Sequence, residues 1–476
     1  MNRRIKMLFS SIPFLYYFLP VVILLYFLVP FKFKNLILLA ASLFFYFYGE
    51  PVYVSLMIFS IISAYIHGLL IGKFRGRILS KVFLVSSVII GLSGLLFFKY
   101  TDFFIRNVNS IFGTNLGLLG LALPIGISFF TFQTISYTID VYRGDAKVQK
   151  NIVHLATYVA LFPQLIAGPI VRYTTVEEDL SGRKHSFEQF SSGVFRFAVG
   201  LAKKVIIADS LGAFCNAGQI FRSVDDKSVV LYWLYALAYC LQIYYDFSGY
   251  SDMAIGLGRM FGFRFLENFN YPFISKSVSE FWRRWHMSLG SWFRDYVYIP
   301  LGGNKVSKLK WFRNVLVVWF LTGFWHGADW PFIAWGLYFA LFLLLEKLFL
   351  ARYLEKLPKF VSHIYVFFVM IVSFVLFNGN GMAGSISDLG GMFGFLNIPF
   401  VNKTTLYYLK SFAPMLVIAA IGATPVVKNT VIKLRDGKKT GKLVAVLEPV
   451  VMVALLVVVT AYLVDSSANF FLYFRF

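Results

Sequence analysis

Two histidines stand where an imidazole could act on a substrate. His326 lies in residues 322–336, which read TGFWHGADWPFIAWG. A helix that begins near Trp311 would carry His326 about 15 residues, or about 22 Å, into a hydrocarbon core about 30 Å thick. An ionisable side chain at that depth is expected to face a protein interior or a water-filled cavity. Because an imidazole can take a proton from a hydroxyl near neutral pH, we predict general-base transfer chemistry at His326.

The residues around His326 predict a break between two helices. Gly323 and Gly327 flank it and should leave room beside the imidazole, and Gly327 can also end a helix. Asp329 comes two residues before Pro331, an order typical of an N-cap residue and a new helix. We expect Asp329 to cap that helix. A hydrogen bond that packs helices together is the alternative role for His326.

His286 lies in residues 277–304, which have the pattern of an amphipathic helix. Ser277 and Glu280 have capping-box spacing, so we expect the helix to begin there and to end near Pro300. At about 100° per residue, one arc of this helix is aromatic and the other is polar. The aromatic arc consists of Phe281, Trp282, Trp285, Leu289, Trp292, Phe293 and Tyr296. The polar arc consists of Glu280, Arg283, Arg284, Ser288, Ser291, Arg294 and Asp295. Such a helix is typical of the membrane interface.

The two histidine segments supply candidate substrate contacts. His286, at the margin of the aromatic arc, either bonds to a neighbour at the interface or points into a cavity bounded by the helix. Arg284 and Asp295 share a direction on the helix and could form a structural ion pair. Alternatively, Arg284 could meet an anionic substrate, since a guanidinium matches a phosphate. The candidate substrate-binding residues are Arg283, Arg284, Arg294, Asp295 and Trp325.

The elements that must position these residues are membrane helices. Of 476 residues, 58% are hydrophobic and 14% are charged, whereas a soluble domain is about half apolar and about a quarter charged. A span needs about 20 mostly apolar residues, and by this rule we expect roughly 10 to 12 spans. The candidates are residues 11–30, 36–48, 52–71, 82–98, 118–139, 152–170, 229–247, 311–325, 331–348, 364–377, 406–423 and 447–464. The runs that contain Pro124 and Pro163 are expected to be broken or re-entrant. We expect a single all-α membrane domain over residues 1–476.

Charge and cysteine content exclude several classes of protein. Lys and Arg total 45 against 23 Asp and Glu, but the cations cluster between apolar runs, as in cytoplasmic loops. We therefore expect no nucleic-acid partner. The two cysteines, Cys215 and Cys240, lie among apolar residues, which argues against a disulfide scaffold and a cysteine metal site. Six basic residues in the loops at 32–34 and 73–81 outnumber Arg3, Arg4 and Lys6, which favours an N-terminus outside the cell.

The two histidine segments resemble the bacterial membrane-bound O-acyltransferases. Residues 279–304 read SEFWRRWHMSLGSWFRDYVYIPLGGN, and residues 320–336 read FLTGFWHGADWPFIAWG. The ending YIPLGGN is similar to the alginate O-acetyltransferase branch of that family. Further similar pieces lie at residues 124–144, 162–170 and 245–263, so the resemblance covers much of residues 120–340.

The resemblance implies a ring of helices around a central tunnel, with His326 as the catalytic histidine and His286 as the second motif histidine. It implies acetyl-CoA as a cytoplasmic acyl donor, and we expect no bound cofactor and no metal. It implies an acceptor that is a cell-envelope polysaccharide, such as alginate or peptidoglycan, reached directly or through a separate extracytoplasmic partner of the SGNH-hydrolase type. We accordingly expect an O-acetyltransferase that is embedded in lipid in the bacterial cytoplasmic membrane.

Our mechanistic hypothesis is that His326 deprotonates an acceptor hydroxyl, which attacks the thioester carbonyl of the donor. His286 positions a substrate or holds the tunnel. The cations near the cytoplasmic opening attract the CoA phosphates, although the positive-inside bias explains the same charges. These cations are Arg283, Arg284, Arg294, Lys305 and Lys308. Asp246 and Asp252 either line the tunnel, pair with Arg259 or cap helices.

Three other functions remain open at this point. A D-alanyl transferase of teichoic acid synthesis would use a carrier protein and would not depend on CoA. A transporter or flippase of an envelope precursor would use the same cavity and would survive His326→Ala, unless the imidazole is its coupling group. A scaffold for cell-wall assembly would tolerate changes at both histidines.

Overall fold

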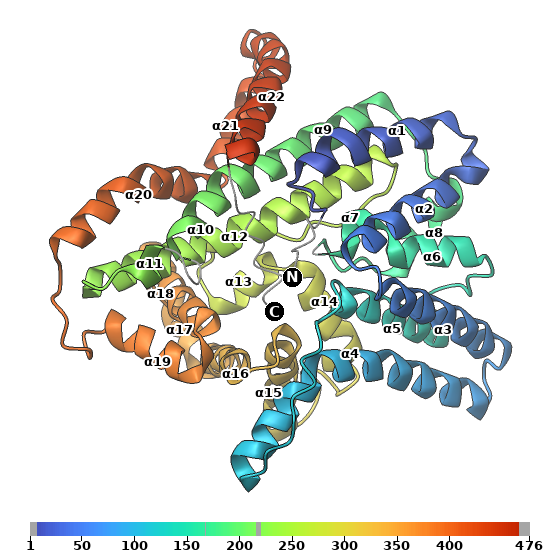
Figure 1. The fold of residues 1–476 in the computed structure, drawn as a ribbon, viewed down its shortest axis with the longest axis horizontal. Coiled ribbons are helices and arrows are strands. Elements are labelled where there is room, and N and C mark those ends of the chain that lie inside the picture. Colours follow the sequence, from blue (N-terminus) through green and yellow to red (C-terminus); the bar gives the residue numbers. More distant parts are fainter. Residues whose placement is uncertain (1–6, 167, 216–219, 466–476) are drawn as a thin grey trace. The chain divides into compact units, whose positions relative to one another are not determined.

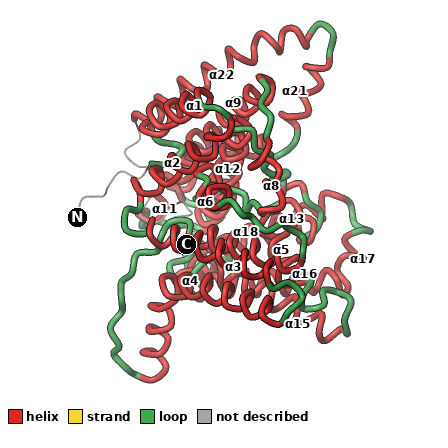
Figure 2. Tube along the Cα trace, turned by 90° about the vertical axis from the view of Figure 1, so that its right-hand side faces the viewer, coloured by secondary structure: helices red, strands yellow, loops and turns green. Residues whose placement is uncertain are grey.

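The computed structural model describes residues 7–166, 168–215 and 220–465, and every regular element within these ranges is a helix (Figures 1 and 2). The chain forms two compact units. The first contains Met1–Phe197 and Tyr250–Leu266, and the second contains Ala198–Gly249 and Glu267–Phe476. Two long helices, α9 (Phe187–Ala202) and α12 (Val229–Met260), contribute residues to both units.

The first unit holds most of the N-terminal helices. They are η1 (Phe14–Phe18), α1 (Leu19–Leu28), α2 (Phe31–Gly49), α3 (Val54–Lys73), α4 (Ile78–Phe112), α5 (Ile127–Arg143), α6 (Ile152–Ala160), α7 (Phe162–Leu165) and α8 (Tyr173–Gly182). Helix α3 packs against α4, α5 and α6. A buried guanidinium ties the unit together, because Arg183 donates to the hydroxyl of Tyr26 and the side-chain oxygen of Asn35, both at 2.7 Å, and to the carbonyl of Phe261 at 3.0 Å.

The second unit holds both histidine segments. Its shorter elements are η2 (Lys203–Ala208), α10 (Asp209–Cys215), α11 (Ile220–Ser223), η3 (Pro272–Ile274), α13 (Val278–Arg284), α14 (Met287–Phe293), η4 (Arg294–Tyr298), η5 (Glu346–Leu350) and α17 (Ala351–Leu354). Its longer helices are α15 (Lys308–His326), α16 (Trp330–Leu345), α18 (Lys359–Asn378), α19 (Gly381–Met392), α20 (Lys403–Gly422), α21 (Val426–Asp436) and α22 (Thr440–Asp465). Apolar side chains of α12, α13, α16 and α18 form one core, which includes the fully buried Tyr239, Phe281 and Phe339.

Helices α15 and α16 approach each other closely at two glycines. A Cβ atom on Gly323 would collide with the carbonyl oxygen of Phe332, and a Cβ atom on Gly336 would collide with the carbonyl oxygen of Trp319. Only hydrogen atoms at these positions allow the backbones to come so near, as in small-residue contacts between membrane helices. This contact fixes the helix that carries His326 against the helix that follows it.

Seven helical runs in the described ranges are long and apolar enough to cross a membrane, which confirms the all-α membrane class. They are α2, α3, α4, the run Trp330–Leu354, α18, α20 and α22. This number is below the expected 10 to 12 because several predicted spans are short, broken or more polar. Residues 14–28 form a shorter apolar helix, 118–139 is helical only from Ile127, and 152–170 divides into α6 and α7 before Pro163. The predicted spans 229–247 and 311–325 lie within the long helices α12 and α15.

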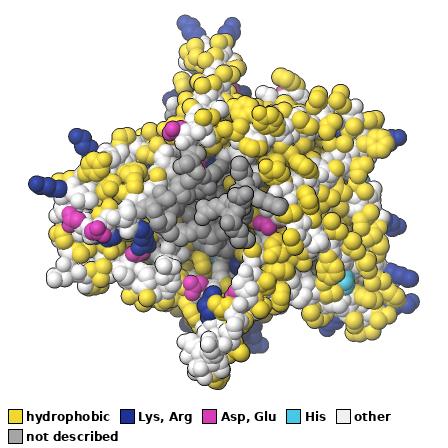
Figure 3. Space-filling model, in the orientation of Figure 1, with side chains coloured by type: hydrophobic (Ala, Val, Ile, Leu, Met, Phe, Trp, Pro, Cys, Tyr) yellow, Lys and Arg dark blue, Asp and Glu magenta, His cyan; other side chains and the backbone are white. Residues whose placement is uncertain are grey.

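The spanning helices expose apolar side chains. Within their most apolar stretches, only 11% of the α4 residues and 6% of the α22 residues are buried by protein. Figure 3 shows apolar side chains over much of the visible surface, with Lys and Arg gathered at edges. Contiguous apolar surface of this extent is typical of contact with lipid. The orientation argument used Arg3, Arg4 and Lys6, which lie outside the described residues.

Candidate active site

The helix expected over residues 277–300 begins as predicted but is not continuous. Ser277 caps α13, because its hydroxyl accepts a hydrogen bond from the backbone N–H of Glu280 at 3.0 Å. Helix α13 then ends at Arg284, and His286 adopts a left-handed conformation with φ 43° and ψ 53° before α14 begins. This conformation is uncommon for a residue that is not glycine, and such strain concentrates at functional sites. The prediction of one unbroken helix is therefore wrong at His286.

The sequence predicts an aromatic arc at the membrane interface, but in the structure most of this arc packs against protein. Phe281, Trp285, Leu289, Trp292 and Phe293 are all buried. The segment keeps its buried face across the break because α13 and α14 both direct aromatic side chains toward the interior of the second unit. The hydrophobic pattern therefore identifies the apolar face of the segment, but it predicts neither what covers that face nor the break in the backbone.

His286 is 2% exposed and is held on one side of its ring. Its Nδ1 lies 3.2 Å from the side-chain oxygen of Asn268, and its ring meets Phe247 edge to face with centroids 4.5 Å apart. Its Nε2 is buried and has no hydrogen-bond partner in the described part of the chain. Burial lowers the pKa of His286 to about 3, so the imidazole is neutral near pH 7.

His326 lies at the predicted helix break. It is the last residue of α15, and Gly327 follows with extended backbone. Asp329 caps α16 as expected, because its carboxylate accepts a hydrogen bond from the backbone N–H of Trp330 at 2.8 Å, and Pro331 occupies the first turn. The two glycines leave less room beside the imidazole than predicted. A Cβ atom on Gly327 would collide with the ring of Phe332.

Aromatic rings surround the imidazole of His326. Trp335 and Phe377 meet it edge to face, with centroids at 5.0 Å and 5.4 Å and an interplanar angle of 82° in both pairs. Trp325 lies 4.9 Å from it on the same helix. The imidazole is half-buried, so these contacts fix the ring and leave part of it accessible.

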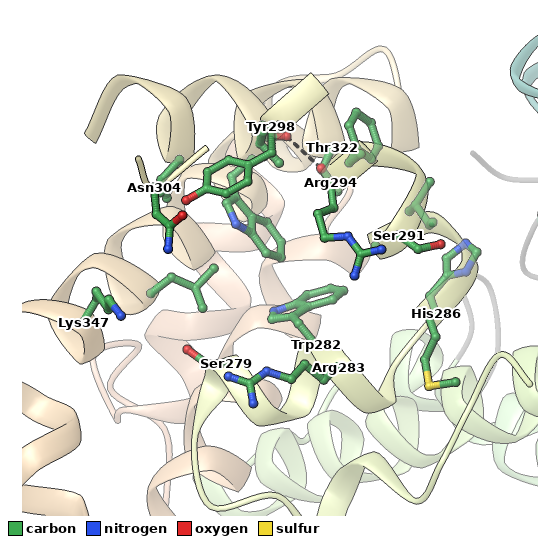
Figure 4. Close-up of a pocket in the computed structure, with 18 of the residues that line it drawn as sticks. Ser279, Trp282, Arg283, His286, Ser291, Arg294, Tyr298, Asn304, Thr322 and Lys347 are labelled. Atoms are coloured by element: carbon green, nitrogen blue, oxygen red, sulfur yellow. Dashed lines mark hydrogen bonds between the residues drawn. The ribbon is translucent and has the colours of Figure 1, made fainter. Parts of the chain in front are cut away.

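A cavity of about 590 Å³ lies beside these residues in the second unit (Figure 4). Three of the predicted site residues line it, namely His286, Arg283 and Arg294. Its remaining lining residues are Ser279, Trp282, Met287, Leu289, Gly290, Ser291, Phe293, Tyr298, Asn304, Trp311, Val315, Val318, Trp319, Thr322, Leu343 and Lys347. Figure 4 shows the guanidinium of Arg294 directed into the cavity above Trp282, with His286 at one side and Lys347 at the other.

The other predicted contacts lie elsewhere. Arg284 pairs with Glu280 at 2.9 Å, one helical turn away, and Asp295 pairs with its neighbour Arg294 at 2.6 Å. The expected Arg284–Asp295 pair required one continuous helix, and the break at His286 removes that register. Trp325 and His326 are outside the cavity lining, although Trp325 contacts His286 with ring centroids 6.3 Å apart.

Two of the predicted acidic candidates take part in buried or half-buried ion pairs. Asp246 pairs with the buried Lys204 at 2.8 Å, and the same ammonium meets Asp209 at 2.5 Å. Asp252 pairs with Arg196 at 2.7 Å. Ion pairing was one of the alternatives, with Arg259 as the expected partner, but these pairs are with Lys204 and Arg196. In the ranges that the structure describes, no group of three or more His, Cys, Asp or Glu side chains could hold a metal ion.

Sequence reasoning missed two functional candidates. Lys347 follows the apolar run of α16 and adds a third cation to the cavity. A cation that ends an apolar run is the usual pattern at a membrane boundary, so the sequence offered no separate signal for it. Asn268 lies in an irregular segment 18 residues before His286, and only the folded chain brings the two together.

Comparison with known proteins identifies the family of this chain. The sequence profile of MBOAT, the membrane-bound O-acyltransferase family, matches residues 146–387. The chain belongs to this family and is an O-acyltransferase.

Its relatives include named transferases of the bacterial envelope. The chain is 41% identical to a probable alginate O-acetylase AlgI of Azotobacter vinelandii, over 85% of this chain and 82% of the relative. It is 35% identical to a peptidoglycan O-acetyltransferase of Helicobacter pylori, over 82% and 81% of the two chains. It is 31% identical to a teichoic acid D-alanyltransferase of Bacillus subtilis, over only 46% of this chain and 58% of the relative.

Proposed function

We propose that this O-acyltransferase moves an acetyl group from acetyl-CoA toward hydroxyl groups of a cell-envelope polysaccharide. The observation that carries the proposal is the cavity that has His286 on one side and Arg283, Arg294 and Lys347 around it. The cavity lining therefore contains both a neutral imidazole and three cations. This combination suits a donor that has a reactive thioester and a phosphorylated tail. Names of relatives that cover most of the chain support acetyl as the group transferred.

His326 is the base in this mechanism. Its imidazole takes the proton from an acceptor hydroxyl, and the hydroxyl oxygen attacks the carbonyl carbon of the thioester. The tetrahedral intermediate then collapses with cleavage of the C–S bond, and the imidazolium returns the proton to the thiolate of CoA. The aromatic rings of Trp335 and Phe377 keep the imidazole of His326 in one orientation, and ordered positioning of this kind lowers the entropic part of the barrier.

The three cations bind the donor. Guanidinium and ammonium groups recognise phosphates by charge and hydrogen bonding. Arg294 keeps one side in contact with Asp295 while its guanidinium is directed into the cavity. Of the cations proposed from sequence, Arg283 and Arg294 line the cavity and keep this role, and Lys347 is added to them. Arg284 instead forms an ion pair with Glu280 within α13.

The names of the relatives support the proposed acceptor and cellular setting. A polysaccharide of the bacterial envelope lies outside the cytoplasmic membrane, so the acetyl group must cross that membrane. A separate extracytoplasmic transferase of the SGNH type would receive it or hand it to the polysaccharide. This arrangement requires a multi-pass protein in the cytoplasmic membrane. The distribution of Lys and Arg supports an N-terminus outside the cell and places the basic segment at 428–442 in the cytoplasm in this proposal.

The test is acetyl transfer from labelled acetyl-CoA in membranes that contain the wild type or His326→Ala. We expect the wild type to release CoA and to label envelope polysaccharide, and His326→Ala to do neither. Transfer at the wild-type rate by His326→Ala would remove the proposed base. Dependence on a D-alanyl carrier protein with no response to acetyl-CoA would instead favour D-alanyl transfer.

A further inference from the structure

The tautomer of His286 can be deduced from the groups around Asn268. The side-chain oxygen of Asn268 lies 3.2 Å from the backbone nitrogen of Ser288 and 2.9 Å from the Ser288 hydroxyl. A backbone N–H can only donate, so the atom of the Asn268 amide that faces it must be the carbonyl oxygen. The orientation of this amide, which distance alone does not reveal, is thereby fixed.

The same oxygen decides which nitrogen of His286 carries the proton. It lies 3.2 Å from Nδ1 of His286. The Ser288 hydroxyl also lies near Nδ1, at 3.4 Å, but it donates its proton to the same Asn268 oxygen at 2.9 Å. Because that oxygen can only accept, Nδ1 donates to it as well, and in the neutral ring the lone pair is then on Nε2. Nε2 is the buried atom that has no hydrogen-bond partner among the described residues, and His286 lines the cavity.

Backbone hydrogen bonds hold this arrangement in place. The N–H of Met287 donates to the carbonyl of Asn268 at 3.0 Å, and the N–H of Asn270 donates to the carbonyl of Arg284 at 2.9 Å. The segment with Asn268 is therefore paired with both sides of the break between α13 and α14. The left-handed conformation of His286 is held by these bonds and by the packing of Phe247 against its ring.

We infer that Asn268 is a positioning residue, which holds His286 as the Nδ1–H tautomer so that Nε2 accepts a hydrogen bond from an N–H or O–H group of a substrate in the cavity. The inference rests on the proposed function, because it assigns the chemistry of one contact within that site. Two sources offer such a donor group. One is the amide N–H of a pantetheine arm, and the other is the hydroxyl of the acceptor.

The decisive measurement compares Asn268→Ala and Asn268→Asp with the wild type in the acetyl-transfer assay. Asn268→Ala removes the acceptor and frees the ring to exchange tautomers, so kcat/KM should fall by about 10-fold, the effect expected from the loss of one hydrogen bond to the substrate. Asn268→Asp keeps an oxygen at that position and should restore most of the loss. A rise in the KM for acetyl-CoA would identify the pantetheine amide as the donor group, and a fall in kcat would identify the acceptor hydroxyl.

Asn270→Ala is the matched control. The contacts of Asn270 with α13 both use its backbone, so its removal should change kcat/KM by less than about 2-fold, the range of an exposed substitution. If Asn268 acts through His286, the losses of activity from the two substitutions should not be additive. In a His286→Ala background, Asn268→Ala should cause no further loss, whereas a residue that only supports the fold would lower activity again.

A spectroscopic readout separates this inference from the proposed function. In protein labelled with ¹⁵N-histidine, the shifts of His286 should show a protonated Nδ1 and an unprotonated Nε2 in the wild type, and a mixture of tautomers in Asn268→Ala. An Nε2–H tautomer in the wild type would overturn the inference whatever the enzyme transfers. Loss of activity in His286→Ala with full activity in Asn268→Ala would overturn the inference and leave the proposed function standing.

Discussion

The indole of Trp325 contacts the imidazole of His286, with ring centroids 6.3 Å apart and planes inclined at 53°. Trp325 also packs against His326, the next residue on α15, at 4.9 Å. One aromatic ring therefore links the two motif histidines, which come from different helix breaks. Through Trp325, His286 in the cavity lining is in indirect contact with His326 at the junction of α15 and α16.

Substitution of His326 should stop the chemical step while the protein stays folded. We expect His326→Gln to lower kcat by at least about 100-fold, the lower end of what a positioned base contributes. The amide of glutamine keeps polarity and similar bulk but cannot accept the proton. His363→Gln is the control, because His363 bonds to the carbonyl of Ser275 on another part of the second unit. Equal turnover numbers for both variants would contradict the role of His326.

Removal of a cavity cation should weaken donor binding more than turnover. Arg294→Ala and Lys347→Ala should each raise the KM for acetyl-CoA by about 10-fold, equivalent to about 1.4 kcal/mol of binding energy. The effect should shrink at high salt because free ions screen the phosphates. Lys428→Ala is the matched control, since this exposed cation of α21 is outside the cavity lining. A similar KM increase in Lys428→Ala would mean that general surface charge, rather than the cavity, attracts the donor.

The close contact of α15 and α16 predicts a large effect from one methyl group. Gly323→Ala should lower stability by about 1–3 kcal/mol, because the new Cβ meets backbone that cannot rotate away. Gly384→Ala in α19 is the control, since the nearest atom to its Cβ lies at an ordinary 3.5 Å. Alanine should be neutral or stabilising at that helical position. Thermal unfolding in detergent measures the stability of both variants. Equal melting temperatures for Gly323→Ala and Gly384→Ala would show that α15 and α16 can move apart at little cost.

The sequence predicted those features that depend on near neighbours along the chain. Caps at Ser277 and Asp329 and the break after His326 follow from local spacing, and the structure has them. Apolar runs predicted the class of protein and the break in the run that contains Pro163, but the number of expected spans included such short, broken or more polar runs and was therefore too high.

The features that escaped prediction depend on distant residues. The apolar period of α13 continues into α14, so nothing in the pattern marks the left-handed turn at His286. Its cause is the pairing with the segment that contains Asn268. In the same way, Lys204 meets Asp246 from a different helix. Charge alone could not choose between that partner and the nearby Arg259.

A buried ion pair in the second unit should be important for stability. Arg222 makes two bonds to Asp388, at 2.7 Å and 2.5 Å, and a third to the hydroxyl of Tyr235 at 3.1 Å. Arg222→Ala leaves the buried carboxylate without this partner and should cost about 2–3 kcal/mol. Arg222→Lys should restore only part of this, because an ammonium lacks the fork that binds both oxygens. Full recovery in the lysine variant would show that charge alone is sufficient.

The pKa of His286 predicts how acid affects the folded protein. Burial lowers this pKa to about 3 from an ordinary value of 6.5, and the side chains that contact the ring, Asn268, Phe247 and Trp325, carry no charge to oppose that shift. Above pH 6.5 the folded and unfolded chains bind the same number of protons at this site, so stability does not depend on it. Below pH 6.5 the unfolded chain binds one more proton, and stability falls as pH decreases toward 3.

His286→Gln should therefore make the folded protein less sensitive to acid. The wild type should lose up to about 1.4 kcal/mol per pH unit through this group between pH 6 and pH 3, and the variant should lack that contribution. The measurement is chemical unfolding in detergent at several pH values, compared as the difference between the two proteins. That difference should be constant between pH 7 and pH 8 and should change in favour of the variant below pH 6. A constant difference across the whole range would show that His286 is protonated in the folded state as readily as in the unfolded one, and that its ring is open to water.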